Sequence, residues 1–407
     1  MQPTWSDDTT TREGGSGAVG HRSPIQPDLV VAELLRRAPV WATRAGDAER
    51  RRCAPTETVA ELVATGAHRL LQPADFGGAE SSFRDHVRAV AAAGLGCPAT
   101  AWCLGVWSVH NWMISLFDPA AQRDVWAADP SVLVSASIVP RLTFAGTGQG
   151  VLVQGRFPFG SGCDHAGWFM VGGLVERDGR TERVMVLLPK DRVRIDQDTW
   201  QVSGLRGTGS KDLVVDDPVE VPHYRVLFLS DADRRVSPGQ CARPVPLYCA
   251  PFMPAATLVL APPVIGAARA ALARFHERIN THGLANRTLQ RNDPGARMRV
   301  AEASAEIDAA ELVLLDAAGR CDALGAQADR LAVEDARITR DTAFAVRMAA
   351  RAVDRLMEAS GGASLSEDEP LQRLWRDASA VRLHAVLTWD TAAANYADAV
   401  LGKSDVA

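Results

Sequence analysis

Residues 157–173, FPFGSGCDHAGWFMVGG, place several chemically capable side chains within a few positions. Cys163, Asp164 and His165 are the residue types that bind metal ions. Because the three are consecutive, their side chains cannot converge on one ion without an unusual backbone, and no second cluster of ligands is evident. A metal site is therefore not expected here.

The Gly160-Ser161-Gly162 step in the same stretch allows a different chemistry. Ser161 lacks the G-x-S-x-G frame and the strand-to-helix context of a hydrolase nucleophile. The two glycines let the backbone approach a ligand closely, and the hydroxyl between them can donate or accept a hydrogen bond in the plane of a heteroaromatic ring. The structural alternative is an ordinary β-turn with a surface serine.

The chain that must position these residues divides into three ordered zones after a polar tail. Residues 1–27, rich in Gly, Thr, Ser and Pro, predict disorder, and residues 28–130 predict a helical domain with capping patterns at Thr58-x-x-Glu61 and Ser82-x-x-Asp85. Short runs rich in Val, Leu and Phe in residues 131–240 predict an antiparallel β-barrel or sandwich. Residues 241–407 return to long amphipathic patterns and predict a four-helix bundle. The expected fold is mainly α with an inserted β domain.

Composition narrows the class of protein. The 407 residues are 47% hydrophobic and 23% charged, with a formal net charge of -5, and the lysines and arginines are dispersed. This gives no reason to expect nucleic acid or an anionic membrane as a partner. Seven scattered cysteines without a Cys-x-x-Cys pair suggest neither a disulfide framework nor a zinc site. We see no uninterrupted apolar stretch of the ~18 residues that a membrane span needs, so a cytoplasmic protein is expected.

Longer motifs carry a resemblance to a known family. QPADFGG (72–78), WQVSGLRGTGSKDLVVDDPVEVP (200–222) and GGASLSEDEPLQRLWRD (361–377) resemble, in order and spacing, proteins of the acyl-CoA dehydrogenase fold. LFDPAAQRDVW, SGCDHAGW and GLRGTGS resemble more closely the oxygenase components of two-component flavin-dependent monooxygenases. That group includes p-hydroxyphenylacetate 3-hydroxylase, hydroxylases of secosteroid phenols and aromatic polyketides, and aminosugar N-oxygenases.

The resemblance implies a catalytic role for His384. Acyl-CoA dehydrogenases that carry their glutamate base near the C-terminus place it after the Arg-Asp pair, whereas this segment has no glutamate and His384 stands there, as in the oxygenase branch. An imidazole can take the proton of a phenol, so that the electron-rich ortho carbon attacks a flavin C4a-hydroperoxide. Without the resemblance, a helix histidine that caps a neighbour or faces solvent is the simpler interpretation.

The resemblance also implies a flavin site. Trp102 and His110 are eight residues apart, which puts them on nearly one face of a helix. An aromatic core stripe would give the same pattern, but the matching face of the family implies that His110 contacts the substrate and Trp102 walls the flavin. Ser161 would stand near flavin N5 and slow loss of peroxide from the hydroperoxide. The resemblance implies that the loops carrying Ser135, Ser137, Ser161 and Gly162 lie against the isoalloxazine ring.

The same resemblance implies partners. Arg278 aligns with an arginine that meets the cofactor phosphate from a neighbouring subunit, and Gly361 and Gly362 would approach that ligand, so a homotetramer is expected. No G-x-G-x-x-G sequence follows an expected strand, as a dinucleotide fingerprint would, which indicates that a separate NAD(P)H-flavin reductase supplies the reduced cofactor. Reduced FMN is expected, and FAD is the alternative.

The sequence thus predicts a reduced-flavin-dependent monooxygenase that uses dioxygen to hydroxylate a phenolic or polycyclic aromatic substrate. The Ala- and Arg-rich composition is typical of high-GC bacteria, in which such enzymes tailor polyketides during antibiotic biosynthesis. Three alternatives remain: N-hydroxylation of an aminosugar or amine on the same fold, acyl-CoA dehydrogenation with tightly held FAD, and a non-enzymatic helical scaffold.

Overall fold

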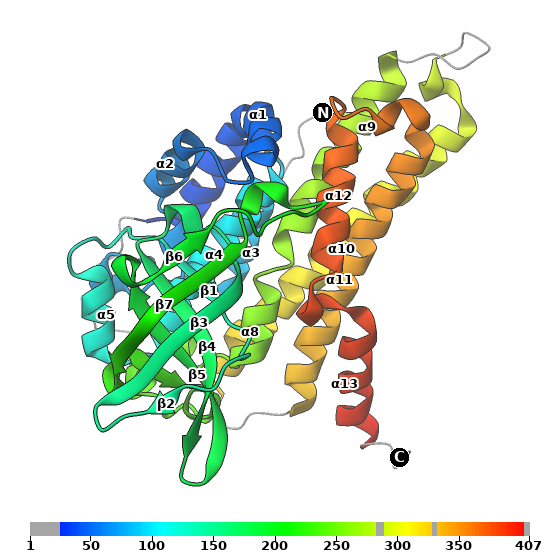
Figure 1. Ribbon diagram of the computed structural model, residues 1–407. Coiled ribbons are helices and arrows are strands. Elements are labelled where there is room, and N and C mark those ends of the chain that lie inside the picture. The colour runs from blue at the N-terminus through cyan, green and yellow to red at the C-terminus, as the bar shows by residue number, and fades with distance from the viewer. Residues whose placement is uncertain (1–24, 282–288, 328–331, 403–407) are drawn as a thin grey trace.

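The computed structural model describes residues 25–281, 289–327 and 332–402. Helices precede and follow a β region, and the long C-terminal helices extend away from it (Figure 1). Most of the predicted tail, residues 1–24, lies outside the described residues. The mainly helical fold with inserted strands is as predicted.

Between residues 25 and 130 the structure shows five α-helices, α1 (Pro27–Arg51), α2 (Thr56–Thr65), α3 (Phe83–Gly94), α4 (Pro98–Ile114) and α5 (Pro119–Trp126). The predicted cap at Ser82 is confirmed, because its side chain accepts a hydrogen bond from the backbone N–H of Asp85 at the start of α3.

The predicted cap at Thr58 is wrong. Helix α2 begins at Thr56, so Thr58 and Glu61 lie inside it. Glu61 instead accepts hydrogen bonds from the indole N–H of Trp41 at 2.8 Å and from Arg44 at 3.0 Å, both in α1. Polar contacts between two packed helices have replaced the local capping contact.

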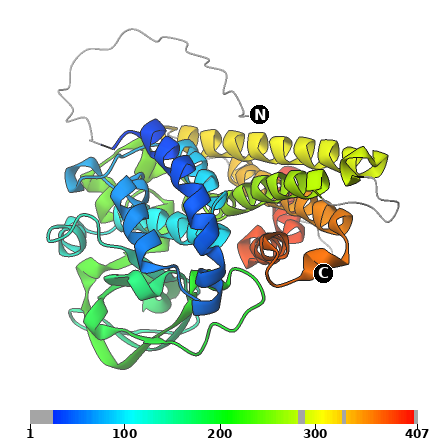
Figure 2. The same cartoon turned by 90° about the horizontal axis from the view of Figure 1, so that it is seen from above.

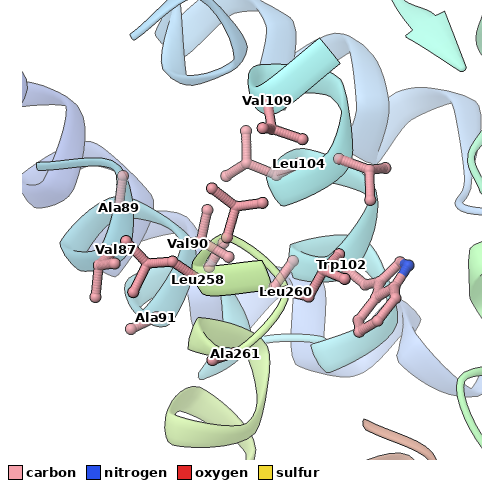
Figure 3. Packing of buried hydrophobic residues seen from close by; sticks show 14 of the residues in the cluster. Val87, Ala89, Val90, Ala91, Trp102, Leu104, Val109, Leu258, Leu260 and Ala261 are labelled. Carbon is pink, nitrogen blue, oxygen red and sulfur yellow. The ribbon is translucent and has the colours of Figure 1, made fainter. Parts of the chain in front are cut away.

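Helix α4 is buried along its whole length, since every residue from Pro98 to Ile114 is inside the protein. Its apolar side chains pack with those of α3 and of the segment around Leu258 and Leu260, and Trp102 lies at the edge of this cluster (Figure 3). A helix that is apolar on all sides is stable only in such a core. The surroundings of α4 therefore fix where Trp102 and His110 point.

The β region contains two four-stranded sheets. One has the strand order β1-β4-β5-β8 and the other β2-β3-β7-β6, and a second apolar core includes side chains of both. The pairs are antiparallel except for β1 and β4, which are parallel because the chain passes through β2 and β3 of the other sheet between them. The strands are β1 (Val134–Ser137), β2 (Ala145–Gly146), β3 (Gly150–Gly160), β4 (Trp168–Arg177), β5 (Arg180–Pro189), β6 (Arg194–Asp196), β7 (Lys211–Pro222) and β8 (Val226–Phe228).

In the described residues of the C-terminal part, five longer helices stand where four were predicted. They are α9 (Pro262–Thr281), α10 (Pro294–Gly325), α11 (Ala332–Ser360), α12 (Pro370–Arg382) and α13 (Trp389–Leu401), preceded by short α6 (Leu229–Asp233), α7 (Pro238–Ala242) and α8 (Phe252–Leu258). Figure 2 shows the long helices side by side, extending away from the β region. The helical structure is interrupted between α12 and α13, and His384 lies in that break rather than on a helix.

One segment has the length and composition of a membrane span. Residues Phe252–Thr281, which include α8 and α9, reach a mean hydropathy of 1.6, but 83% of the most apolar window is buried inside the protein. We did not expect such a stretch from the sequence. Burial to this extent is typical of a helix in a protein core.

Candidate active site

Three parts of the fold meet around Ser161. Helix α4 contributes Trp102, the loop after β3 contributes Ser161, and the break after α12 contributes His384. The indole Nε1 of Trp102 donates a hydrogen bond to the Ser161 hydroxyl at 3.1 Å. The ring centroids of Trp102 and His384 are 5.5 Å apart, with a tilt of 53°. Residues far apart in the sequence are thus brought together, with Trp102 between the serine and the histidine.

The end of β3 is shaped to present Ser161. The pairing of β3 with β7 shifts register between Phe157 and Gly160, and Phe159 has a φ of 67°, a left-handed value that is unusual for a non-glycine residue. Irregular strand ends of this kind are common beside functional sites, where they redirect a side chain. Ser161 itself is only 8% exposed.

Gly162 is required by space as well as by backbone conformation. Its φ is 66°, and a Cβ built there would lie 2.6 Å from the indole Nε1 of Trp107. The glycine therefore lets the loop pass directly against the Trp107 ring in α4. The close backbone approach that Gly162 allows is thus an approach to the protein's own core.

Ser135 and Ser137 hold this loop from strand β1. The Ser135 hydroxyl donates to the backbone carbonyl of Ser161 at 2.9 Å, and the Ser137 hydroxyl donates to the carbonyl of Pro158. Both residues lie beside the strand end that carries Ser161, and both hydroxyl hydrogens are used on backbone carbonyls. What they do directly is fix the strand end that carries Ser161.

His110 is held as a neutral imidazole. It is buried, and its Nδ1 lies 2.6 Å from the carbonyl of Val134 in β1, a distance at which Nδ1 carries the hydrogen and donates. Burial lowers the pKa of His110 to about 4. The neutral ring therefore has its lone pair on Nε2, available to accept a hydrogen bond.

His384 has an unsatisfied polar atom inside the protein. Its Nδ1 is buried and has no hydrogen-bond partner among the residues that the structure describes. Burial lowers the pKa of this imidazole, which keeps it neutral and able to accept a proton at neutral pH. A buried polar atom without a partner is costly unless a ligand satisfies it. The histidine thus fits a site that is completed by a bound molecule.

Arg278, Gly361 and Gly362 form a separate group at the helical bundle. Arg278, near the end of α9, donates from Nη2 to the carbonyl of Ser360 at 2.7 Å, directly before the two glycines. Gly361 has a φ of 70° and ends α11, and a Cβ at Gly361 or Gly362 would meet no atom within 4 Å. The structure brings these three residues together, but not to Ser161.

Cys163, Asp164 and His165, which follow the Gly160-Ser161-Gly162 step, have a structural role. Asp164 accepts hydrogen bonds from the Lys211 ammonium at 2.7 and 2.8 Å, and the Lys211 side chain is only 4% exposed. The ring of His165 contacts the carbonyl of Ala54 at 2.8 Å, and Cys163 Sγ donates to a backbone carbonyl. In the described chain, no group of three His, Cys, Asp or Glu residues is arranged to hold a metal ion.

Sequence reasoning missed Ser210 and Thr208, which lie behind Ser161. Ser210 Oγ is 2.7 Å from Ser161 Oγ and also 2.7 Å from Thr208 Oγ1. Both belong to the quoted motif GLRGTGS, so the sequence contained the signal, but only the fold shows that the motif packs against the loop of Ser161. Asp377 was also missed, and its carboxylate accepts from the N–H of Leu205 at 2.6 Å, which holds the start of this motif.

Two grooves in the described part of the chain lie elsewhere. One, of about 640 Å³, is on the α10, α11 and α13 face beside Phe344 and Trp389. The other, of about 340 Å³, is on the β region beside Arg225. Neither is lined by a predicted site residue. We therefore place the candidate site by the contacts of Ser161, Trp102 and His384.

These residues fit a flavin. The Ser161 hydroxyl can make a further hydrogen bond, Trp102 gives a flat aromatic surface, and His384 Nδ1 lacks a partner. An isoalloxazine ring needs this combination of a flat apolar wall and a few polar groups at its edge.

Comparison with known proteins agrees with this chemistry. Residues 258–389 match the family model of the acyl-CoA dehydrogenase C-terminal domain. The chain is 37% identical over 361 residues to the flavin-dependent monooxygenase oxygenase subunit HsaA of Rhodococcus jostii, covering 85% of this chain and 91% of that protein. It is 32% identical over 386 residues to the oxygenase component of FADH(2)-dependent resorcinol hydroxylase from a Rhizobium species, covering 92% and 94%.

A solved structure supports the same assignment. The crystal structure of the HsaA monooxygenase from M. tuberculosis superimposes with a TM-score of 0.86 at 35% identity, covering 93% of this chain and 98% of that one. Identity above 30% over most of both chains establishes common family membership. The protein therefore belongs to the flavin-dependent monooxygenases with the acyl-CoA dehydrogenase fold, and it is the oxygenase component of a two-component enzyme.

Proposed function

We propose that this oxygenase hydroxylates a phenolic or polycyclic aromatic substrate, of the kind found in aromatic polyketides. The observation that carries the proposal is the position of His384, a half-buried neutral imidazole whose buried Nδ1 lacks a partner among the described residues, beside the Trp102 ring. Trp102 in turn contacts Ser161. In this geometry the aromatic ring of the substrate would lie between His384 and the edge of the flavin.

His384 would act as the base. A neutral imidazole can take the phenol proton, and the resulting phenolate is more electron-rich at its ortho carbon. His110, with Nε2 as an acceptor, would hold a second polar group of the substrate. The nearby aromatic side chains would bind the apolar part of a flat ligand. The relative with resorcinol in its name has a phenolic substrate, which supports the proposal by analogy.

The cofactor would be reduced FMN, with reduced FAD as the alternative that the name of the Rhizobium relative favours. When bound, the reduced flavin would supply activated dioxygen as its C4a-hydroperoxide. This chain's part is to hold the ring at Trp102, Ser161 and the loop of Gly162, and to keep bulk water from it.

A separate NAD(P)H-dependent reductase would deliver the reduced flavin. The terms oxygenase subunit and oxygenase component in the names of the relatives support such a partner. Arg278, with Gly361 and Gly362, would meet the flavin phosphate of a neighbouring subunit in a homotetramer, which is why these residues lie apart from Ser161 within one chain. We propose a cytoplasmic location for this assembly.

A coupled assay tests the proposal. An unrelated flavin reductase and NADH supply reduced FMN or FAD, and resorcinol and larger phenols are offered under ¹⁸O₂. We expect a hydroxylated product that contains one labelled oxygen, and no product when the oxygenase is omitted. Hydrogen peroxide as the only product with every phenol would contradict a phenol hydroxylase. Oxidation of an acyl-CoA by the purified protein would identify a dehydrogenase instead.

A further inference from the structure

A continuous chain of hydrogen bonds runs inward from Ser161. Trp102 Nε1 contacts Ser161 Oγ at 3.1 Å, and Ser161 Oγ contacts Ser210 Oγ at 2.7 Å. Ser210 Oγ contacts Thr208 Oγ1 at 2.7 Å, and Thr208 Oγ1 contacts the backbone carbonyl of Leu205 at 2.8 Å. Ser210 is 5% exposed and Thr208 is 1% exposed. The three hydroxyls therefore depend on one another for their hydrogen bonds.

The inner end of the chain fixes its direction. The Leu205 carbonyl can only accept, so Thr208 must use its single hydroxyl hydrogen there. Ser210 must then donate to Thr208, and Ser161 must donate to Ser210. The opposite direction would leave two oxygens, Thr208 Oγ1 and Leu205 O, facing each other at 2.8 Å without a hydrogen between them. That arrangement is unfavourable in a buried site.

The direction decides what Ser161 can offer a ligand. A hydroxyl has one hydrogen and two acceptor positions. In Ser161 the hydrogen goes to Ser210, and one acceptor position receives the indole N–H of Trp102. What remains is one acceptor position, and no donor.

We propose that Ser210 and Thr208 are positioning residues that hold Ser161 as a hydrogen-bond acceptor, so that the site selects a flavin with hydrogen on N5. Reduced flavin carries N5–H and can donate to Ser161. Oxidised flavin has only a lone pair at N5, which would face the lone pair of Ser161. The inference rests on the proposed flavin site, and it adds a means by which the chain prefers the reduced cofactor.

The surrounding backbone keeps the two loops together. The N–H of Gly162 donates to the carbonyl of Thr208 at 2.8 Å, and Cys103 in α4 also donates to that carbonyl. A side-chain substitution at Ser210 or Thr208 leaves these backbone contacts in place. The hydroxyl chain can therefore be altered while the loop of Ser161 stays where it is.

The test compares the affinity of the full-length protein for reduced and oxidised flavin, measured anaerobically with both FMN and FAD by equilibrium dialysis. Ser210→Ala frees the Ser161 hydrogen to point at N5. Thr208→Val, which has nearly the same shape, lets Ser210 turn its hydrogen toward Ser161 and so has the same effect. Thr208→Ser is the matched control, because it keeps the hydroxyl. Thermal unfolding of each variant verifies that it is folded.

We expect the wild type and Thr208→Ser to bind the reduced form more tightly. In Ser210→Ala and Thr208→Val the ratio of the two affinities should fall roughly three- to tenfold, the value of one hydrogen bond. An unchanged ratio in both variants, with flavin still bound, would overturn the inference and leave the proposed function intact. Failure of the wild type to bind any form of FMN or FAD would overturn the proposed function itself, and the inference with it.

Discussion

The ion pair between Asp164 and Lys211 gives a quantitative test of how the loop of Ser161 is held. Lys211 Nζ donates to both carboxylate oxygens of Asp164 and to the side-chain oxygen of Gln197. The Lys211 side chain is 4% exposed and the Asp164 side chain 16%. Asp164→Ala removes two of these contacts and leaves a buried ammonium. Breaking a buried pair in this way costs about 3–5 kcal/mol of unfolding free energy.

The unequal burial predicts unequal effects. Lys211→Met leaves the less buried Asp164, which water can reach and to which Gln197 still donates, so the loss should be smaller, about 1–3 kcal/mol. The double variant leaves no unpaired charge and should be more stable than Asp164→Ala alone. Urea unfolding at pH 7 measures all three.

Asp216→Ala is the control, because Asp216 pairs with Arg194 on the same sheet and both side chains are more than half exposed. Exposed pairs contribute little, so little or no loss is expected. If Asp164→Ala is no less stable than this control, or if the double variant loses the sum of the two single losses, the buried pair does not hold the loop as described.

Three further predictions address single residues. Gly162→Ala should cost about 2–4 kcal/mol, because its φ of 66° is left-handed and its Cβ would collide with Trp107; a melting temperature equal to the wild type would contradict this. His384→Asn should lower product formed per flavin oxidised about a hundredfold or more while flavin affinity is kept, and unchanged coupling would show that the base is another group. Burial lowers the pKa of His86 to about 3, so between pH 6.5 and 3 the unfolded state binds a proton that the folded state does not, and stability falls as pH falls. Between pH 7 and 5 the wild type should lose about 2 kcal/mol more than His86→Asn in urea unfolding, and equal losses would refute the assignment.

Local patterns predicted the elements well where local forces decide. The Ser82 cap and the burial of the helix Pro98–Ile114 follow from neighbouring residues and from an apolar pattern on all sides. The cap at Thr58 failed because Glu61, which the pattern assigned to capping, instead contacts α1 across 20 residues of sequence. A capping pattern cannot reveal a competing partner that only packing provides.

The site itself was predictable in part. Motif resemblance and helical spacing pointed to Trp102, Ser161 and His384, and the fold brings these three together. The partners behind them could not be predicted, since Ser161 meets Ser210 across 49 residues and Asp164 meets Lys211 across 47. Such contacts depend on how β3 and β7 pair, which no local pattern contains.

A single-turnover experiment tests whether this protein hydroxylates a phenol with reduced flavin and dioxygen. The protein is mixed anaerobically with chemically reduced FMN or FAD and a phenol, and then with oxygenated buffer, while flavin absorbance and product are followed. We predict that flavin oxidation is delayed relative to free flavin and that hydroxylated phenol forms in nearly equal amount to the flavin oxidised. Reoxidation as fast as that of free flavin, with hydrogen peroxide and no hydroxylated phenol, would contradict the account.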